Sequence, residues 1–408
     1  MRIDIAHRTI AEIRAFTAQD VKLNNRVYTV DSEKEGLWIY DSTDTTTADN
    51  LGLVLVTVSG ARYKRKFDKA VQPEWWYTSG SWHTAINTAI ASNKEVYLKA
   101  KTYTITGNIV PITGTSIKGE GKNTVITIGA NDVKAFYINA AGTTNVTIQD
   151  LAIDGGSQYT NVYTGFRQSY GVYISRATKI VLHNLDIYNM GIVHLGDVIN
   201  DNPIGDPYGY GGYGIQAECR YGVIKDILIS DCRIRNIAGG GNIFGDGVNI
   251  SGFDLTSSGI VPENIMIVNT TTDTCARHGF SVAGVTEESF GANVTFLNCT
   301  SKNSNLDGLD IEDGYGVKVK GFRVSNAGRT NIYYDPVAVY GANYHLFAGI
   351  ALGNSSNYNT FEDVIIENSY YGISIGAGGD NTFTNVECKN SVTRDLNLGL
   401  AYIGQRFT

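Results

Sequence analysis

Gly308-Leu-Asp-Ile-Glu-Asp-Gly314 carries a pattern that recurs along the chain: a glycine, then apolar residues that alternate with polar ones. The other copies begin at Gly171, Gly214, Gly247, Gly279, Gly349 and Gly372, so successive glycines lie 43, 33, 32, 29, 41 and 23 residues apart. A second alternating stretch, such as Asp226-Ile-Leu-Ile-Ser-Asp231, follows most copies. Repeats of about 20–45 residues that contain short strands and no helical pattern are typical of a stacked β-solenoid. The sequence therefore predicts an all-β chain whose equivalent positions lie one above another, about 4.8 Å apart.

The composition agrees with many short strands joined by tight turns. The 408 residues include 46 glycines and only 6 prolines, and 42% are hydrophobic, which is enough for a long core. A net charge of −7 argues against nucleic acid or an anionic membrane as the main partner. No apolar run approaches about 18 residues, so we expect no membrane insertion. Residues 1–8 lack the apolar stretch of a secretory signal, which fits synthesis in a bacterial cytoplasm.

The five cysteines do not form a zinc or redox motif. They are Cys219, Cys232, Cys275, Cys299 and Cys388, with no CxxC pair among them. Most occupy small apolar strand positions, where cysteine behaves as a buried hydrophobic residue. We therefore expect reduced thiols in the core, no metal site and no cofactor.

The chain divides into three parts. Residues 1–78 lack the coil pattern and predict a small N-terminal β-rich domain. Residues 79–130 contain Ser81-Trp-His-Thr-Ala-Ile-Asn-Thr-Ala-Ile-Ala-Ser-Asn93, which predicts a short amphipathic helix with Ser81 as its N-cap, followed by the first coils. Such a helix is a common lid for the first coil of a solenoid. Residues 131–408 predict the body of the solenoid, with a catalytic groove.

These parts together resemble the tailspike depolymerases of bacteriophages. The resemblance rests on the Tyr40-Asp-Ser-Thr43 and Asp49-Asn-Leu-Gly52 passages, the Ala-Ile repeat of the helix, and Lys118-Gly-Glu-Gly-Lys-Asn-Thr124. It implies a right-handed, single-stranded parallel β-helix of the pectate-lyase-like group that degrades capsular or other surface polysaccharides. It also implies a homotrimer in the tail of the virion, attached to other phage tail proteins through its N-terminus and acting at the bacterial cell surface. The group contains hydrolases, lyases and esterases, so it supports the fold better than the reaction.

Stacking the coils on their glycines brings acidic residues together. The residues that precede the glycines form the column Tyr170, Tyr213, Asp246, His278, Asp307, Ala348 and Tyr371. Asp246 and Asp307 lie two rungs apart in this column, which suits the acid and base of an inverting glycosidase, with His278 between them. The alternative is that aspartates before glycine are ordinary turn residues.

The coil Asn305–Gly314 is the second acidic feature. Alternation points Asp310 and Glu312 outward from the same strand, where like charges raise each other's pKa as a general acid requires. The alternative is a solvated acidic turn or a calcium site. We take Asp246, His278, Asp307, Asp310 and Glu312 as catalytic candidates. The substrate-binding candidates are Arg277, Asn249, Asp313, Tyr210, Tyr213 and Tyr334.

The same stretch resembles the polygalacturonase branch of the β-helix enzymes. Gly245-Asp246-Gly247 is similar to the Gly-Asp-Asp element of that branch, and Arg277-His278-Gly279 to its Gly-His-Gly element. Asn305-Leu306-Asp307 is similar to the Asn-Thr-Asp element but follows the histidine coil. Asp310-Ile311-Glu312 stands where the branch has Arg-Ile-Lys, a charge reversal that argues against galacturonan as substrate.

Two long loops, Met190–Tyr213 and Ala327–Ala348, precede the same strand column at the two ends of this patch. Their tyrosines predict walls that stack on sugar rings, or alternatively contacts between subunits of a trimer. The sequence as a whole predicts a glycoside hydrolase that cuts bacterial polysaccharide internally. A polysaccharide lyase, with His278 and Arg277 or Lys318 and Lys320 in the roles of base and cation, is one alternative. A non-catalytic glycan-binding receptor protein is the other.

Overall fold

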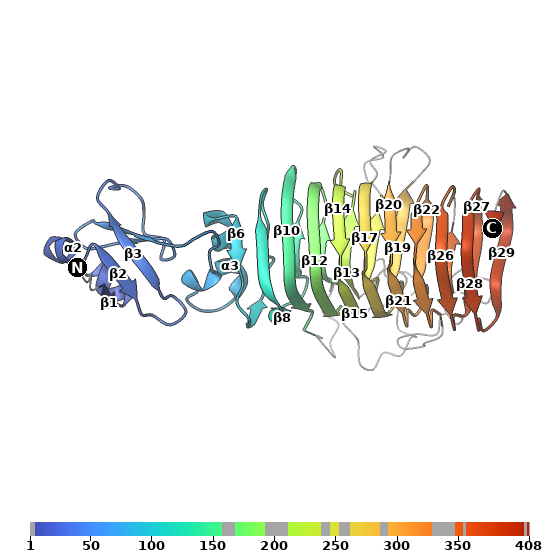
Figure 1. Cartoon of the computed structure of the whole chain (residues 1–408), viewed down its shortest axis with the longest axis horizontal. Helices are drawn as coiled ribbons and strands as arrows, with labels where there is room; N and C mark the ends of the chain where they lie inside the picture. Colours follow the sequence, from blue (N-terminus) through green and yellow to red (C-terminus); the bar gives the residue numbers. More distant parts are fainter. Residues whose placement is uncertain are drawn as a thin grey trace. The chain divides into compact units, whose positions relative to one another are not determined.

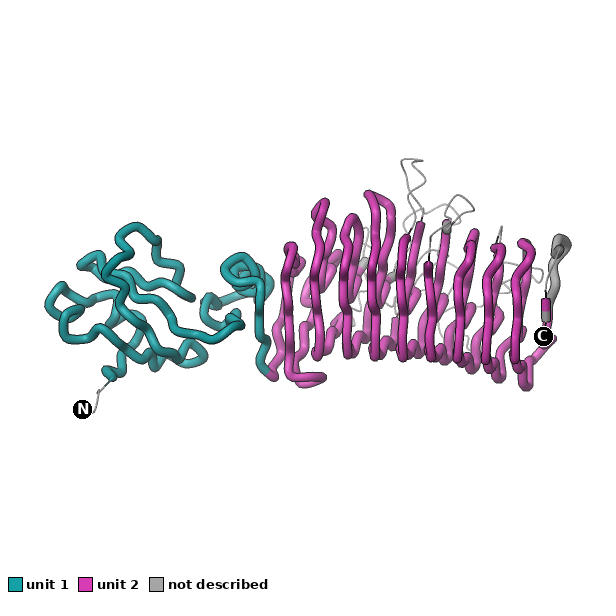
Figure 2. Tube along the Cα trace, turned by 45° about the horizontal axis from the view of Figure 1, so that its top comes forward, with its two compact units in different colours: residues 1–99 teal, residues 100–408 magenta. Residues whose placement is uncertain are grey.

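The computed structural model describes residues 5–156, 168–191, 211–237, 245–252, 262–285, 293–328, 347–353, 356–403 and 406–407. The chain forms two compact units, Met1–Lys99 and Ala100–Thr408 (Figure 2). The predicted capping helix belongs to the first unit, together with the N-terminal strands. Each unit is described here by itself.

The first unit is built on a small twisted sheet. Its strands run in the order β1-β2-β3-β5-β4. Their bounds are β1 (Ala6–Arg8), β2 (Arg26–Thr29), β3 (Gly36–Asp41), β4 (Val54–Val56) and β5 (Arg62–Arg65). The segments around Arg26, Gly36, Asp49 and Arg62, which the sequence marks as β-rich, each contribute a strand here. Below the sheet, Trp38, Leu55 and Tyr63 are fully buried against apolar residues of two short helices.

Those two helices were not predicted from the sequence. They are α1 (Ile10–Arg14) and α2 (Ala18–Leu23), and each begins with a capping box, Thr9 with Glu12 and Thr17 with Asp20. A capping box satisfies backbone N–H groups that a helix start leaves unpaired, so it stabilises even one-turn helices. The Thr-x-x-Glu/Asp spacing predicts the start of each helix, but it is easily missed in a domain whose sequence otherwise predicts strands.

The helix predicted from Ser81 is α3 (Trp82–Ser92), with Ser81 at its N-cap. The Ser81 hydroxyl, however, lies 2.7 Å from Nδ1 of His83 and does not cap a backbone N–H. Within the first unit α3 packs against the 3₁₀ helix η1 (Pro73–Trp75) and strand β6 (Glu95–Tyr97). Ile86 and Ala89 of α3 are fully buried.

The second unit is a parallel β-helix, as predicted (Figure 1). Sheet 1 contains β7 (Thr102–Ile105), β8 (Ser116–Ile128), β10 (Thr143–Asp154), β12 (Ala177–Met190), β14 (Lys225–Ser230), β15 (Arg233–Ile237), β17 (Glu263–Val268), β18 (Thr271–Cys275), β20 (Val294–Leu297), β21 (Thr300–Lys302), β23 (Lys318–Lys320), β24 (Arg323–Ser325), β26 (Thr360–Glu367), β28 (Thr382–Lys389) and β30 (Arg406–Phe407). Sheet 2 contains β9 (Lys134–Ile138), β11 (Gln168–Ile174), β13 (Gly211–Glu218), β16 (Val248–Ser251), β19 (Phe280–Val285), β22 (Leu309–Gly314), β25 (Ala348–Gly353), β27 (Tyr371–Gly379) and β29 (Arg394–Ile403). Each strand of sheet 2 pairs in parallel with the equivalent strand of the next coil.

The register of sheet 2 confirms the alignment of coils on their glycines. Val248 pairs with Phe280, and Phe280 with Leu309, so the first apolar position of each motif forms one inward row. Ile250 and Ile311, two residues further along, are fully buried as predicted. The glycines themselves mark a close approach between coils: a Cβ on Gly247 would lie 2.5 Å from the carbonyl oxygen of Gly279. Only glycine fits there, so the column is fixed by sterics.

Asparagine and aspartate hold the corners of the coils, as their position at strand ends suggested. Asp226, Asn264, Asp231 and Asn269 all adopt left-handed backbone conformations, with φ between 52° and 55° or at 49°. Asn and Asp tolerate this region better than other side chains. Neighbouring corners bind each other: Nδ2 of Asn264 donates to Oδ1 of Asp226 at 2.7 Å, and Nδ2 of Asn269 to Oδ1 of Asp231 at 3.1 Å. These amide ladders fix the corners of successive coils in register.

None of the five cysteines forms a disulfide bond, and all but Cys388 are buried. Burial raises the pKa of Cys232 and of Cys299 to about 12, so both stay protonated at neutral pH. In the described part of the chain, no group of three or more His, Cys, Asp or Glu side chains could hold a metal ion. Likewise, no described helix is long and apolar enough to cross a membrane.

Candidate active site

Strands β16, β19 and β22 position the predicted acidic column. The backbone N–H of Gly247 donates to the carbonyl of His278, and that of Gly279 to the carbonyl of Asp307, each at 3.0 Å. Asp246, His278 and Asp307 therefore lie on three consecutive rungs, as the sequence predicted. Asp310 lies on the outward row of β22, where it pairs with Ser281 of β19.

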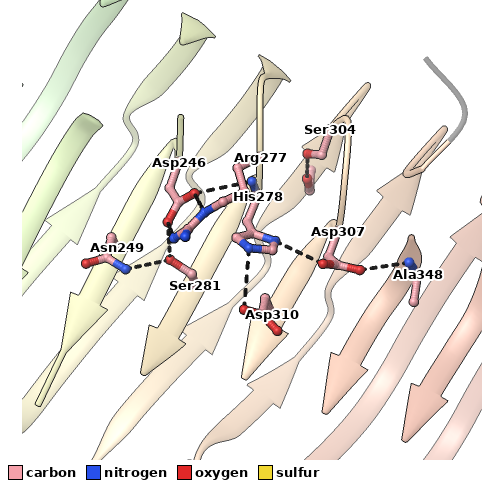
Figure 3. Close-up of polar contacts among 10 residues, drawn as sticks. Asp246, Asn249, Arg277, His278, Ser281, Ser304, Asp307, Asp310 and Ala348 are labelled. Carbon is pink, nitrogen blue, oxygen red and sulfur yellow. Dashed lines mark hydrogen bonds and ion pairs between the residues drawn. The ribbon is translucent and has the colours of Figure 1, made fainter. Parts of the chain in front are cut away.

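Asp246 forms a buried ion pair with Arg277. The guanidinium donates from Nε to Oδ1 at 2.7 Å and from Nη2 to Oδ2 at 2.6 Å, in a bidentate arrangement (Figure 3). The Ser281 hydroxyl also donates to Oδ2 at 2.7 Å, and the backbone N–H of His278 to Oδ1 at 3.3 Å. Burial alone would raise the pKa of Asp246, but Arg277 more than offsets it and the pKa is lowered. Asp246 is therefore a fully ionised carboxylate whose oxygens are already engaged.

His278 lies between two other carboxylates. Its Nδ1 is 3.0 Å from Oδ2 of Asp307, an ion-pair distance without hydrogen-bond geometry, and its Nε2 is 3.5 Å from Oδ2 of Asp310 (Figure 3). All three side chains are at least 95% buried. Asp307 is held from the other side, because the backbone N–H of Ala348 donates to its Oδ1 at 2.8 Å.

Asp310 and His278, which face each other through Nε2 of the imidazole, both have raised pKa values. Burial raises the pKa of Asp310 well above its usual value; His278 opposes this, and Glu312 and Asp307 add to it. Burial would lower the pKa of His278, but the carboxylates around it, Asp310 first, raise it overall. Asp310 is thus a carboxyl group that keeps its proton to higher pH, and its buried Oδ1 has no hydrogen-bond partner among the described residues.

The remaining candidates of this coil are less enclosed. Glu312 and Asp313 are both partly exposed, and Asp313 adopts a left-handed conformation with φ of 51°. Glu312 stands on the same outward face as Asp310, as predicted, and pairs across the rung with Gly353. Asn249, one coil below Ser281, donates from Nδ2 to the Ser281 hydroxyl at 2.8 Å. It therefore contacts the Asp246 cluster through Ser281.

Of the predicted substrate contacts, Tyr213 and Arg277 do not take the expected place. Tyr213 is 95% buried and its ring stacks on Tyr170, with centroids 5.5 Å apart. Tyr210 and Tyr334, and most of the two loops Met190–Tyr213 and Ala327–Ala348, lie outside the described residues. Arg277, predicted to bind substrate, donates hydrogen bonds from its guanidinium to Asp246.

The lysines proposed for a lyase are in the wrong place. Lys318 and Lys320 belong to β23 of sheet 1, whereas His278 and Asp310 lie along sheet 2. Nζ of Lys320 pairs with Oε1 of Glu362 at 2.6 Å, and Nζ of Lys318 donates to Oδ1 of Asn293 at 3.1 Å. The prediction was wrong because the two alternating stretches of a coil face different sides, so nearness in sequence does not bring them together.

Sequence reasoning missed the role of Ser281. It occupies the same outward column as Gln216, Asn249 and Asp310, and this position was the available signal.

A cavity of about 360 Å³ also lies elsewhere, on the outer side of sheet 1. It is lined by Asn298, Thr300, Gly321, Arg323, Asp363, Ile365, Asn385 and Glu387. None of these belongs to the acidic cluster.

The comparisons with known proteins identify the N-terminal domain. Residues 7–68 match the family model of the phage tail protein small four-stranded beta-sheet domain. Residues 7–68 are therefore similar to a domain of phage tail proteins. The match covers the sheet β1 to β5 and confirms the resemblance that the sequence suggested. A search of the curated proteins finds no match.

Solved structures confirm the fold of the whole chain. The tailspike protein of Acinetobacter baumannii phage AM24 is 12% identical with a TM-score of 0.53, over 98% of this chain and 65% of that one. The tailspike gp49 of A. baumannii phage Fri1, described as a capsular polysaccharide depolymerase, is 11% identical with a TM-score of 0.51, over 98% and 75%. PfbA, a surface adhesin of Streptococcus pneumoniae, is 12% identical with a TM-score of 0.54, over 83% and 98%. The chain thus spans under two thirds of the AM24 tailspike, and the likeness at this identity concerns the fold.

Proposed function

We propose that this phage tail protein is a tailspike depolymerase that hydrolyses a bacterial capsular or other surface polysaccharide within its chain. The observation that carries the proposal is the environment of Asp310: a buried carboxyl with a raised pKa, beside an imidazole and with one oxygen unengaged. A general acid that works near neutral pH needs this combination.

Asp310 donates a proton to the leaving glycosidic oxygen, and Glu312 is its partner. The two residues lie two positions apart on β22, so their side chains share a face and their Cα atoms are roughly 6.6 Å apart. The two carboxyls of an inverting glycosidase are about 6.5–9.5 Å apart, which leaves room for a water molecule, and side chains that extend from these two Cα atoms can span that separation. Glu312 then activates that water, and hydrolysis proceeds with inversion at the anomeric carbon.

The other members of the cluster position this pair. Asp307, fixed by the N–H of Ala348, keeps the His278 ring in place, and His278 in turn faces Asp310. Asp246 accepts a hydrogen bond from the backbone of His278 while its charge is matched by Arg277. The sequence predicted Asp246 and Asp307 as the catalytic pair, but a carboxylate neutralised by a bidentate arginine, as Asp246 is, is a poor proton donor. We therefore assign Asp246 and Asp307 a positioning role.

Analysis of released products tests the reaction. The protein is incubated with a panel of bacterial capsules, and released oligosaccharides are examined by mass spectrometry and ultraviolet absorbance. Hydrolysis gives saturated ends, whereas a lyase gives an unsaturated uronate that absorbs in the ultraviolet. Unsaturated products would refute hydrolysis, and an absence of products from every capsule would refute depolymerisation altogether.

A glycan-binding receptor protein is the second candidate. It is favoured by the similarity of the fold to the PfbA adhesin, since one scaffold carries different functions. In either case the N-terminal domain would attach the protein to other phage tail proteins, and the β-helix would act at the bacterial surface as part of a virion-bound homotrimer. The trimer and the attachment follow from the tailspike resemblance.

A further inference from the structure

A second cluster of functional groups lies in the turn after β13, away from Asp310. The ring of Tyr221 is 51% exposed there. Two guanidiniums lie near it, with the central carbon of Arg176 at 5.6 Å and that of Arg220 at 5.8 Å from the ring centroid. A half-exposed aromatic ring beside two cations offers both a stacking face for a sugar and charge for an anion.

The positive charge of this cluster is not neutralised by the described residues around it. Arg176 binds the main-chain oxygen of Asn139 through Nε at 3.1 Å and Nη2 at 2.8 Å, which fixes its direction without consuming its charge. No described carboxylate lies within ion-pair distance of Arg176 or Arg220. Glu218, two residues before Arg220, accepts hydrogen bonds from the Tyr173 hydroxyl and from Nε2 of Gln216. Its burial raises its pKa, although Tyr173, Arg220 and Lys134 oppose this.

A third cation, Lys134, lies one coil away, at the other end of the strands from the Arg176 and Arg220 turns. Lys134 of β9 pairs with Tyr170 of β11, and its Nζ lies 4.9 Å from the centroid of the Tyr170 ring. The first coils of sheet 2 thus carry three cations, with Asp132 and Glu218 as their acidic neighbours. The coil around Asp310 carries four acidic side chains within seven residues, Asp307 to Asp313. The two ends of one face differ in charge.

The register places both ends on the same edge of the sheet. Glu218, two residues before Arg220, pairs with Ser251, Ser251 with Ala283, and Ala283 with Glu312. Three strand spacings, about 14 Å along the coil axis, therefore separate the Arg220 turn from the Glu312 position. An oligosaccharide that lies along the axis can contact both, whereas a single sugar cannot.

We propose that Arg176, Arg220 and Tyr221 form a subsite for a sugar that carries a carboxylate, and that this subsite sets which unit of a repeating polysaccharide lies at Asp310. This inference rests on the proposed function. Guanidinium groups match the geometry of a carboxylate, and the aromatic ring supports the pyranose beside it. Because the acidic cluster repels an anionic sugar, the charged unit occupies the arginine subsite and a neutral unit is presented for cleavage. The substrate class is thus an acidic polysaccharide with charged and uncharged residues in one repeat.

Binding is measured with the full chain carrying Asp310→Asn, so that the glycan is not degraded, on an array of anionic and neutral bacterial capsular polysaccharides. For each anionic capsule that is bound, a second sample has its carboxyl groups chemically reduced to alcohols. Arg220→Gln, Arg220→Lys and Tyr221→Ala are added singly. Arg233→Gln, which removes an exposed arginine from β15 of sheet 1, is the matched control.

We expect binding to anionic capsules that Arg220→Gln weakens about 10-fold, since a hydrogen bond to a charged group is lost. Arg220→Lys keeps part of the affinity, Tyr221→Ala weakens binding as well, and Arg233→Gln leaves it unchanged. Carboxyl reduction should mimic Arg220→Gln, and the two together should not add, because they remove the same contact.

Equal binding to native and reduced glycan, unchanged binding by Arg220→Gln, or binding to neutral capsules alone would overturn the subsite. Absence of binding to every anionic capsule would overturn it too. A different outcome would refute the proposed function but not the subsite. In that case the unmodified chain would bind a capsule, with Arg220 required, and release no oligosaccharide from it.

Discussion

Asp246→Asn should lower the stability of the protein, whereas Asp310→Asn should lower its activity. The reason is that the Asp246 carboxylate neutralises a buried arginine and the Asp310 carboxyl donates the proton in the proposed reaction. The Asp246 side chain is fully buried and its partner Arg277 is only 18% exposed. Asn cannot match both N–H donors of the guanidinium and carries no charge, so the buried arginine loses its carboxylate partner. Removing one partner from a buried pair costs about 3–5 kcal/mol of unfolding free energy.

Asp310→Asn removes much less from the fold. Its closest charged contact is His278, with 3.5 Å between Oδ2 and Nε2, and its Oδ1 has no partner among the described residues. Asparagine keeps the shape but cannot donate a proton to a leaving oxygen. We expect activity to fall by about 10²–10⁴-fold while thermal stability changes little.

The assay combines release of reducing ends from a susceptible capsule with thermal unfolding of the same preparations. Asp380→Asn is the matched control, since Asp380 is an exposed corner residue with φ of 54°, a conformation that asparagine also accepts. It should behave as the parent in both measurements. If Asp246→Asn kept full stability and lost all activity, while Asp310→Asn stayed active, the assignment of roles would be refuted and Asp246 would be the acid.

Four further predictions can be tested. Activity should decline as pH rises through the raised pKa of Asp310, because the acid must be protonated, and a pH profile without an alkaline limb would contradict this. The pKa of Asp246 is lowered from 3.8, so the stability it contributes should be present above pH 3.8 and be lost as pH falls through its folded-state pKa. The pKa of His278 is raised from 6.5, so its contribution should be complete below pH 6.5 and be lost as pH rises through its folded-state pKa. Thermal melts of the parent, of Asp246→Asn and of His278→Gln across pH would show both effects. Ile311→Asp should cost several kcal/mol, roughly 4 or more, because it buries an unpaired charge in the apolar row, and an unchanged melting temperature would refute the inward assignment. Light scattering should give three times the 44.3 kDa mass of the chain, and a monomer mass at micromolar concentration would exclude the trimer.

The rows of the β-helix could be predicted from the sequence because two steric rules fix them. Alternation decides which residues of a strand point inward, and the close approach at positions such as Gly247 admits only glycine, so coils align on these residues whatever the loop length between them. The helices α1 and α2 escaped because a one-turn helix leaves no periodic pattern to read.

The partners of the acidic side chains were harder to predict, because a column tells which backbones are adjacent and not which side chains meet. Asp246 shares its column with His278, yet it binds Arg277, the residue just before that histidine. The inverting pair was predicted from residues of one column, and this approach missed Arg277, which lies one position away from the column.

The signal that separates the acids nevertheless lies in the sequence once neighbouring rungs are compared. In a stacked coil, a buried side chain finds its charge partner on the rung above or below, at its own position or the one beside it. Asp246 has an arginine there, and its pKa is lowered. Asp310 pairs across the rungs with Ser281 and Ala351, neither of which can be a cation, so burial dominates and its pKa is raised. The acid of a β-helix site is therefore to be sought where an acidic residue in the outward column has only small neutral residues above and below it.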